Sequence, residues 1–121
     1  MKRIVVAEDD PAISALISKV LSQFYEVIVT GDGPTALSVA AQAPAPDLLL
    51  LDVMMPGMDG HAVAAAVRQL PGLKSIPIIF LTAKTGPAEV IKGIQSGARH
   101  YITKPFKIEE LVTRVKKTLG G

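Results

Sequence analysis

The sequence predicts a doubly wound α/β domain, in which helices cover both faces of a parallel β-sheet. Two observations support this class. Five apolar runs rich in β-branched residues recur along the 121 residues, and a segment with the periodicity of an amphipathic helix follows each run. Successive βα units favour parallel strands joined by right-handed crossovers. We therefore expect a single three-layer domain over residues 1–121.

The five apolar runs are the expected strands. They occupy residues 3–8, 26–30, 47–52, 77–82 and 100–103. The first, third and fourth runs are almost continuously apolar, as the interior strands of a parallel sheet are, whereas the second and fifth are shorter and more polar. We therefore place the second and fifth strands at the edges, and the order 2-1-3-4-5 satisfies this placement.

The expected helices follow from apolar stripes between and after these strands. They lie within residues 13–24, 34–42, 60–70, 88–96 and 108–119. The first and last stripes are the clearest, and the three between them are richer in alanine and glycine. Asp10 is placed to cap the first helix, because Pro11 directly after it suits a first helical turn.

The composition excludes several classes of protein. The chain has no cysteine, which removes disulfides, thiolate zinc sites and thiol catalysis together. Its densest apolar stretch, residues 48–51, is far shorter than the ~18 residues that a membrane span needs. Glu8 ends the first apolar run too early for a signal peptide. We therefore expect a soluble, cytoplasmic protein that does not bind membranes.

Charge is distributed unevenly along a chain whose net charge is only +2. Residues 1–60 contain eight acidic and three basic side chains, and residues 61–121 contain three acidic and ten basic ones. A basic half can indicate nucleic-acid binding, but aromatic residues are few and no run of Lys or Arg exceeds two. We do not expect this domain alone to bind DNA or RNA.

Polar side chains gather at the carboxyl ends of the expected strands, where open α/β sheets bind ligands. The first strand leads to Glu8 and Asp9, the third ends at Asp52, the fourth ends at Thr82, and the fifth leads to Lys104. Carboxylates this close repel one another unless a cation lies between them, and oxygen ligands suit Mg²⁺. Magnesium held by carboxylates commonly completes its shell with water and phosphate oxygens, so the site indicates phosphoryl chemistry.

Four motifs occur in order on these βα units. They are VVAEDD at residues 5–10, LDVMMPGMDG at 51–60, LTAK at 81–84 and YITKPF at 101–106. Together they resemble the receiver domain of two-component response regulators, including the stand-alone chemotaxis type, and the resemblance covers residues 2–119. It implies a flavodoxin-like (βα)5 fold, a three-layer sandwich with the strand order given above.

The resemblance also implies roles for the polar residues. Asp52 would accept a phosphoryl group from the phosphohistidine of a histidine kinase or of a histidine phosphotransfer protein. The ligands of Mg²⁺ would be Glu8, Asp9, Asp52 and the backbone carbonyl of Met54. Among residues that contact the phosphoryl oxygens, Lys104 would pair with their charge, the Thr82 hydroxyl would bind one oxygen, and the N–H of Ala83 would bind another.

The implied switch consists of Thr82 and Tyr101. If the phosphoryl group draws the Thr82 hydroxyl inward, space opens for the Tyr101 ring to turn from an exposed to a buried position. The peptide bond before Pro105 is expected to be cis, which aims Lys104 into the crevice. The protein would not be an enzyme beyond its own phosphorylation and slow dephosphorylation.

Output is expected through protein binding by the helix, strand and helix within residues 88–119. Residues 84–117 contain eight basic and three acidic side chains, a balance that favours an acidic target. The pair Arg99 and His100 stands where many relatives carry acids. His100 and His61 lack metal-ligand spacing, and both are expected at the surface.

Alternative functions differ at identifiable positions. A flavodoxin-like electron carrier needs Ser, Thr or Gly after the first strand, where this chain has acids. A phosphatase of the haloacid dehalogenase type needs a second Asp two residues after Asp52, and Met54 occupies that position. Two alternatives stay open: a degenerate receiver that acts as a phosphorylation-independent interaction module, and the receiver fragment of a larger regulator.

Overall fold

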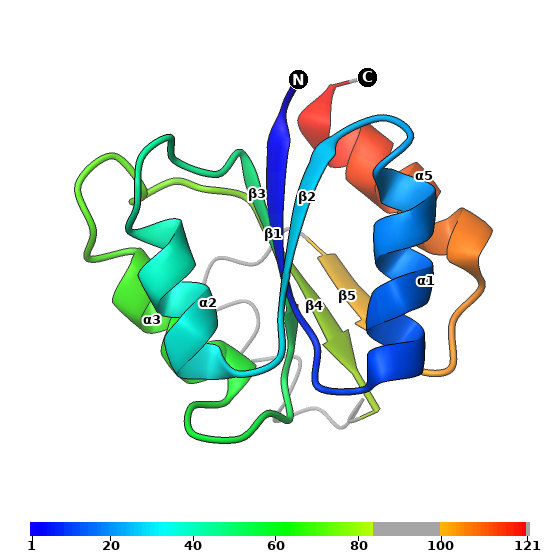
Figure 1. Cartoon of the computed structure of the whole chain (residues 1–121), viewed down its shortest axis with the longest axis horizontal. Coiled ribbons are helices and arrows are strands. Elements are labelled where there is room, and N and C mark those ends of the chain that lie inside the picture. The colour runs from blue at the N-terminus through cyan, green and yellow to red at the C-terminus, as the bar shows by residue number, and fades with distance from the viewer. Residues whose placement is uncertain (84–99, 121) are drawn as a thin grey trace.

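The structure, a computed structural model, describes residues 1–83 and 100–120. The strands described form one parallel sheet in the order β2-β1-β3-β4-β5 (Figure 1). This order confirms the doubly wound α/β class and the predicted placement of the edge strands. The expected helix at residues 88–96 lies outside the described residues, as do Lys84 and Arg99.

The strands begin and end within one residue of the predicted runs. They are β1 (Arg3–Ala7), β2 (Glu26–Thr30), β3 (Leu48–Asp52), β4 (Ile78–Thr82) and β5 (His100–Thr103). β3 and β4 are buried along their whole length, whereas β2 and β5 each have one buried residue and are otherwise partly buried or exposed. This difference arises because helices cover both sides of an interior strand, and an edge strand has one side open to solvent.

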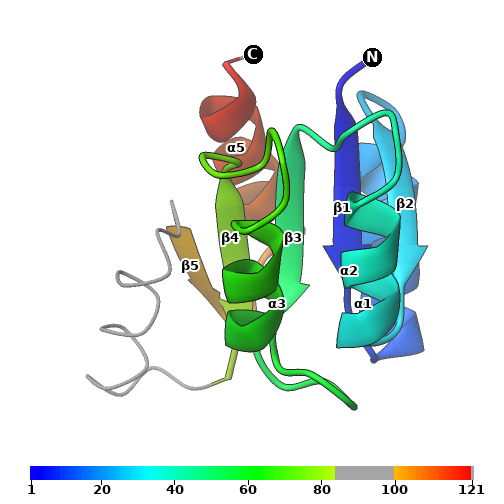
Figure 2. The same ribbon diagram turned by 90° about the vertical axis from the view of Figure 1, so that its left-hand side faces the viewer.

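The helices described form the two outer layers of the molecule. They are α1 (Pro11–Leu21), α2 (Gly33–Ala40), α3 (Gly60–Val67) and α5 (Ile108–Leu119). α1 and α5 cover one face of the sheet, and α2 and α3 cover the other (Figures 1 and 2). None of the helices in the described ranges is long and apolar enough to cross a membrane.

Three of the helices described end two or three residues earlier than predicted, α1 at Leu21, α2 at Ala40 and α3 at Val67. α1 stops at Leu21, because the N–H groups of Phe24 and Tyr25 both bond to the Leu21 carbonyl, at 3.0 and 2.9 Å, and turn the chain toward β2. α3 stops at Val67, where the N–H of Leu70 bonds to the Val67 carbonyl at 2.9 Å in a tighter turn. Phe24 beyond α1 and Leu70 beyond α3 still pack on the protein. The apolar stripe alone could therefore not show where either helix ends.

Two apolar clusters hold the layers together, one on each side of the sheet. Successive side chains of a strand point to opposite faces, so Val5 and Ala7 pack toward α2 and α3, whereas Ile4 and Val6 pack toward α1 and α5. Each fully buried aliphatic side chain contributes about 1.5–3 kcal/mol relative to an exposed one. The sheet is therefore a rigid support for the loops at its ends.

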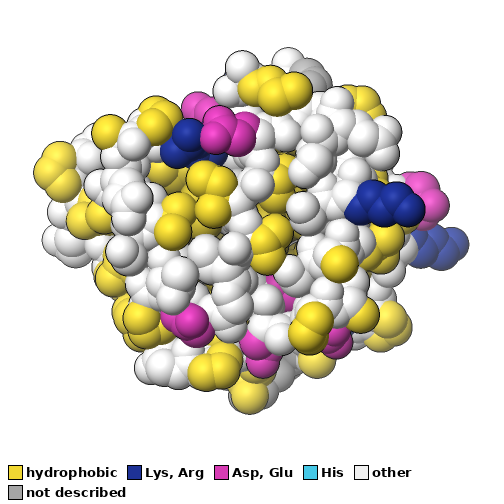
Figure 3. Space-filling model, in the orientation of Figure 1, with side chains coloured by type: hydrophobic (Ala, Val, Ile, Leu, Met, Phe, Trp, Pro, Cys, Tyr) yellow, Lys and Arg dark blue, Asp and Glu magenta, His cyan; other side chains and the backbone are white. Residues whose placement is uncertain are grey.

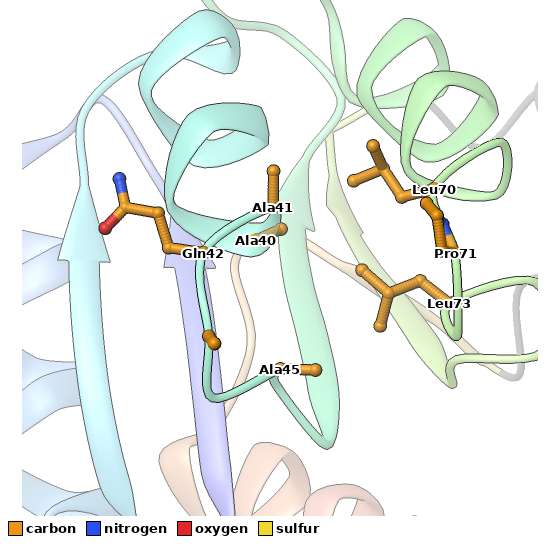
Figure 4. Close-up of a pocket in the computed structure, with 8 residues that line it drawn as sticks. Ala40, Ala41, Gln42, Ala45, Leu70, Pro71 and Leu73 are labelled. Carbon is orange, nitrogen blue, oxygen red and sulfur yellow. The ribbon is translucent and has the colours of Figure 1, made fainter.

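The end of the sheet where the strands begin holds both chain termini and an apolar hollow. The start of β1 and the end of α5 lie at this end of the molecule in both views (Figures 1 and 2), and the Lys2 amine donates a hydrogen bond to the Leu119 carbonyl. The hollow, of about 260 Å³, lies between the segments that follow α2 and α3 (Figure 4). Apart from Gln42, its lining is apolar, so it offers no group for acid–base or phosphoryl chemistry.

Candidate functional site

Three carboxylates meet at the opposite end, where the strands terminate. Glu8 and Asp9 directly follow β1, Asp52 ends β3, and these two strands are paired. One carboxylate oxygen from each residue lies within 4.8 Å of the others. Glu8 and Asp52 are only 2% and 4% exposed, whereas Asp9 is exposed. Figure 3 shows acidic side chains gathered along this lower edge of the molecule.

Lys104 links two of these carboxylates. Its Nζ donates to both carboxylate oxygens of Glu8, at 2.8 and 2.9 Å, and to Oδ2 of Asp52 at 3.0 Å. The Lys104 N–H also donates to the Thr82 carbonyl at 2.8 Å, and the peptide bond before Pro105 is cis. The ammonium of Lys104 thus balances part of the negative charge that the two buried carboxylates concentrate.

Burial and neighbouring charges shift the pKa values of Glu8 and Lys104. Burial raises the pKa of Glu8 from 4.5 to about 7, because the desolvation of the carboxylate outweighs the hydrogen bond from Lys104, and the neighbouring Asp52 adds to the rise. Burial of the amine would lower the pKa of Lys104, but its hydrogen bonds to Glu8 and Asp52 raise that pKa above its ordinary value. Lys104 is therefore a permanent cation at neutral pH, whereas Glu8 changes its charge near neutrality.

The loop between β3 and α3 is held close to Asp52 by backbone contacts. The N–H of Met54 donates to Oδ1 of Asp52 at 3.2 Å, and the N–H of Gly60 donates to the Val53 carbonyl at 2.9 Å. A side chain at position 60 would not fit, since its Cβ would lie 2.5 Å from the Asp52 carbonyl oxygen. Asp59 caps α3 by accepting the N–H of Ala62 at 2.8 Å. Helix and loop thus fix the backbone on which Asp52 stands.

Thr82 and Tyr101 lie on neighbouring strands at the same end of the sheet. Thr82, the last residue of β4, is fully buried, and the exposed Ala83 follows it. Tyr101 is half-buried on β5, where it pairs with Phe80 of β4. The structure therefore brings Thr82, Ala83 and Lys104 to the same end as the carboxylates, with Tyr101 beside them.

His61 is a feature of this region that sequence reasoning missed. We expected it at the surface, but it is half-buried in the first turn of α3 and its ring packs against Phe80. Its Nε2 lies 3.3 Å from the hydroxyl oxygen of Tyr101. His100, the other histidine, lies on β5, and its Nδ1 is 3.2 Å from Nη1 of Arg114. Only the proximity of α3 to β4 and β5, which no sequence pattern reports, reveals the contact of His61.

Comparison with known proteins defines the class to which this fold and site belong. Residues 4–116 match the family model described as the response regulator receiver domain. The chain therefore belongs to the response regulator receiver domain family, whose members are signalling switches of two-component systems rather than classical enzymes.

Three particular relatives illustrate the similarity. The DNA-binding response regulator MtrA of Mycolicibacterium smegmatis is 44% identical over 98% of this chain and 50% of its own length. The chemotaxis response regulator CheY4 of Vibrio cholerae has a TM-score of 0.91 and 33% identity, covering 98% of this chain and 99% of that one. The receiver domain of the sensor histidine kinase PA1611 of Pseudomonas aeruginosa, solved with a magnesium ion coordinated in its active site cleft, has a TM-score of 0.87 and 30% identity, covering 99% and 98%. The chain spans about half the length of MtrA.

Proposed function

We propose that this chain is a phosphorylation-controlled switch over residues 1–121, and that Asp52 accepts the phosphoryl group. The observation that supports this role best is the position of Asp52. It ends the central strand of the sheet, is almost fully buried, lies beside Glu8 and Asp9, and binds the ammonium of Lys104. A structural acid at a strand end has no need of two further acids and a partly buried ammonium.

The donor set fits Mg²⁺. Three carboxylates with oxygens within 4.8 Å, one of them exposed to incoming solvent, are the hard oxygen ligands that this ion prefers. Glu8, Asp9, Asp52 and the backbone carbonyl of Met54 would hold it. When bound, the ion neutralises negative charge between Asp52 and a phosphoryl group. The magnesium ion in the related PA1611 receiver domain supports this assignment.

The remaining chemistry belongs to the side chains. An oxygen of Asp52 attacks the phosphorus of a phosphohistidine, the P–N bond breaks, and the histidine of the donor leaves with the electron pair. Lys104 moves its ammonium toward the transferred phosphoryl oxygens, the Thr82 hydroxyl donates to one, and the N–H of Ala83 donates to another. These donors stabilise the negative charge of the phosphoryl oxygens, which would otherwise repel the carboxylate of Asp52.

Phosphorylation is read out by Thr82 and Tyr101 in this proposal. Once the Thr82 hydroxyl turns toward the phosphoryl group, the space that it leaves favours a buried position of the Tyr101 ring. The geometry supports this coupling, because the two residues are on adjacent strands and their side chains share one face of the sheet.

The partners we propose are a histidine kinase or histidine phosphotransfer protein as donor, and an acidic protein as target, all in the cytoplasm. In the part of the chain that the structure describes, residues 100–119 contain five basic side chains, Lys104, Lys107, Arg114, Lys116 and Lys117, and two acidic ones, Glu109 and Glu110. A basic surface attracts an acidic partner and makes the association sensitive to salt.

The test is labelling with a small phosphodonor and Mg²⁺, followed by intact mass spectrometry. Asp52→Asn should abolish the added phosphoryl mass. Asp59→Asn is the matched control, because it makes the same substitution at the other end of the loop between β3 and α3, and asparagine still caps α3. Asp9→Ala should weaken Mg²⁺ binding in a titration. Labelling that persists in Asp52→Asn would reject Asp52 as the acceptor and move the phosphoryl group to another residue. Labelling that is absent from the wild type would reject the proposal as a whole and favour a phosphorylation-independent interaction module.

A further inference from the structure

An aromatic cluster joins α3 to the strands that contain Thr82 and Tyr101. The rings of His61 and Phe80 have centroids 4.7 Å apart, and those of Phe80 and Tyr101 are 5.4 Å apart. Both distances lie in the range in which aromatic rings attract each other. Since Phe80 is completely buried, it provides a fixed surface for the two half-buried rings.

The hydroxyl of Tyr101 is directed toward α3. Its oxygen lies 3.3 Å from Nε2 of His61, close to the upper limit for a hydrogen bond. The Tyr101 ring also packs against the apolar cluster between the sheet and α3. The arrangement with the ring turned toward α3 therefore combines packing on Phe80 with a hydrogen bond to His61.

This cluster adjoins the phosphoryl site through β4. Phe80 and Thr82 are two residues apart on that strand, so their side chains point to the same face. On β5, Tyr101 pairs with Phe80 and Thr103 pairs with Thr82. Movement of the Thr82 hydroxyl thus changes the space along the same row that Tyr101 occupies, and His61 contacts Tyr101 from a different element.

We propose that His61 is a positioning residue of the output switch, and that it holds the Tyr101 ring turned toward α3, the arrangement that phosphorylation selects. The inference rests on the proposed function of Asp52, Thr82 and Tyr101. It adds a third side chain to the switch, and it places part of the control of Tyr101 on α3 rather than at the phosphoryl site.

Linkage fixes the direction of the expected effect. If His61 stabilises the turned-in ring, replacing His61 lowers the population of that arrangement. It also lowers the affinity of any ligand that binds this arrangement preferentially. One hydrogen bond between uncharged side chains corresponds to a change of roughly two- to ten-fold in an equilibrium. His61→Phe keeps a ring on Phe80 and removes the hydrogen-bonding nitrogen, so it isolates this contribution.

The first measurement follows Tyr101 directly by NMR with ¹³C-labelled tyrosine. The chain has two tyrosines, so a Tyr25→Phe background leaves Tyr101 as the single labelled residue. We expect His61→Phe to shift Tyr101 away from the turned-in arrangement by roughly two- to ten-fold. His100→Phe is the matched control, because it replaces the other histidine, one residue from Tyr101, and should leave the Tyr101 signals in place.

The second measurement is a double-mutant cycle on the affinity for beryllofluoride, a phosphoryl analogue, in the presence of Mg²⁺. His61→Phe should weaken binding by up to about ten-fold in the wild-type background. It should have no effect in Tyr101→Phe, which keeps the ring and lacks the hydroxyl, because the hydrogen bond is already absent. The ¹⁵N shift of His61 Nε2 should also change in Tyr101→Phe, which tests the contact without altering α3.

The outcomes separate this inference from the function on which it rests. Failure of the wild type to bind beryllofluoride with Mg²⁺ would reject the proposed phosphoryl site. Wild-type binding with unchanged Tyr101 signals and no coupling in the cycle would reject the role of His61 alone. Tighter binding by His61→Phe would also reject it, since the contact would then belong to the unphosphorylated arrangement.

Discussion

Replacing Gly60 by alanine tests how closely α3 must begin against the backbone of the phosphoryl site. The added Cβ would lie 2.5 Å from the Asp52 carbonyl oxygen and 3.1 Å from Cα of Val53. Both neighbours are backbone atoms, so no side-chain rotation relieves the contact. Overpacking of this kind costs about 1–3 kcal/mol, and the better helix propensity of alanine offsets at most about 1 kcal/mol. We expect Gly60→Ala to lower the free energy of unfolding by roughly 1–2 kcal/mol.

Urea denaturation of the metal-free protein measures this loss, and Gly31→Ala is its control. No atom lies within 4 Å of a Cβ built at Gly31, so alanine there should be neutral or stabilise by up to about 1 kcal/mol. Because the clash in Gly60→Ala displaces the backbone of Asp52, labelling by a small phosphodonor should also slow. Stability of Gly60→Ala within about 0.5 kcal/mol of the wild type would refute the reasoning, because ordinary surface substitutions reach that size.

Two further predictions concern pH and a surface contact. Without Mg²⁺, the free energy of unfolding should rise as pH falls from about 7 to 4.5, because the raised pKa of Glu8 makes the folded state bind a proton that the unfolded state does not bind in this range. Urea denaturation at several pH values should show a flatter pH dependence for Glu8→Gln than for the wild type. An equal slope in both proteins would contradict the assignment. Lys116 places its Nζ 3.9 Å from the ring centroid of Phe24. Lys116→Met should therefore cost about 0.5–1 kcal/mol in the same assay, whereas the exposed Lys117→Met should cost nothing measurable, and equal losses would exclude a specific contact.

The sheet and its strand order could be predicted because the proportion of apolar residues in each strand indicates how deeply the strand is buried. Leu48 to Leu51 form an unbroken apolar run, which only a strand covered on both sides tolerates, whereas β2 includes the exposed Glu26 and Val29. The ends of the helices were less predictable. Phe24 continues the periodic stripe of α1, yet it lies in a turn and packs under Lys116.

The candidate site was predictable as a location but not as a network. The topology rule sends Glu8, Asp52 and Lys104 to one end of the sheet, and the structure places them there. That Lys104 binds both oxygens of Glu8 depends on side-chain geometry between residues 96 positions apart. The contact between His61 and Tyr101 is of the same kind, because two half-buried rings on different elements leave no periodic signal.

The neighbouring termini have a practical consequence for experiments on this protein. Since Lys2 bonds to the Leu119 carbonyl at the end of the sheet opposite Asp52, an affinity tag or a fluorescent protein joined to either terminus leaves the carboxylate site accessible to the proposed phosphoryl donor. Chain ends this close also suit circular permutation. A short peptide could join them, and new termini could then be opened in the exposed turn at Gly72. A label at an original terminus and a label at Gly72 of the permuted chain would then report the same switch from two different positions.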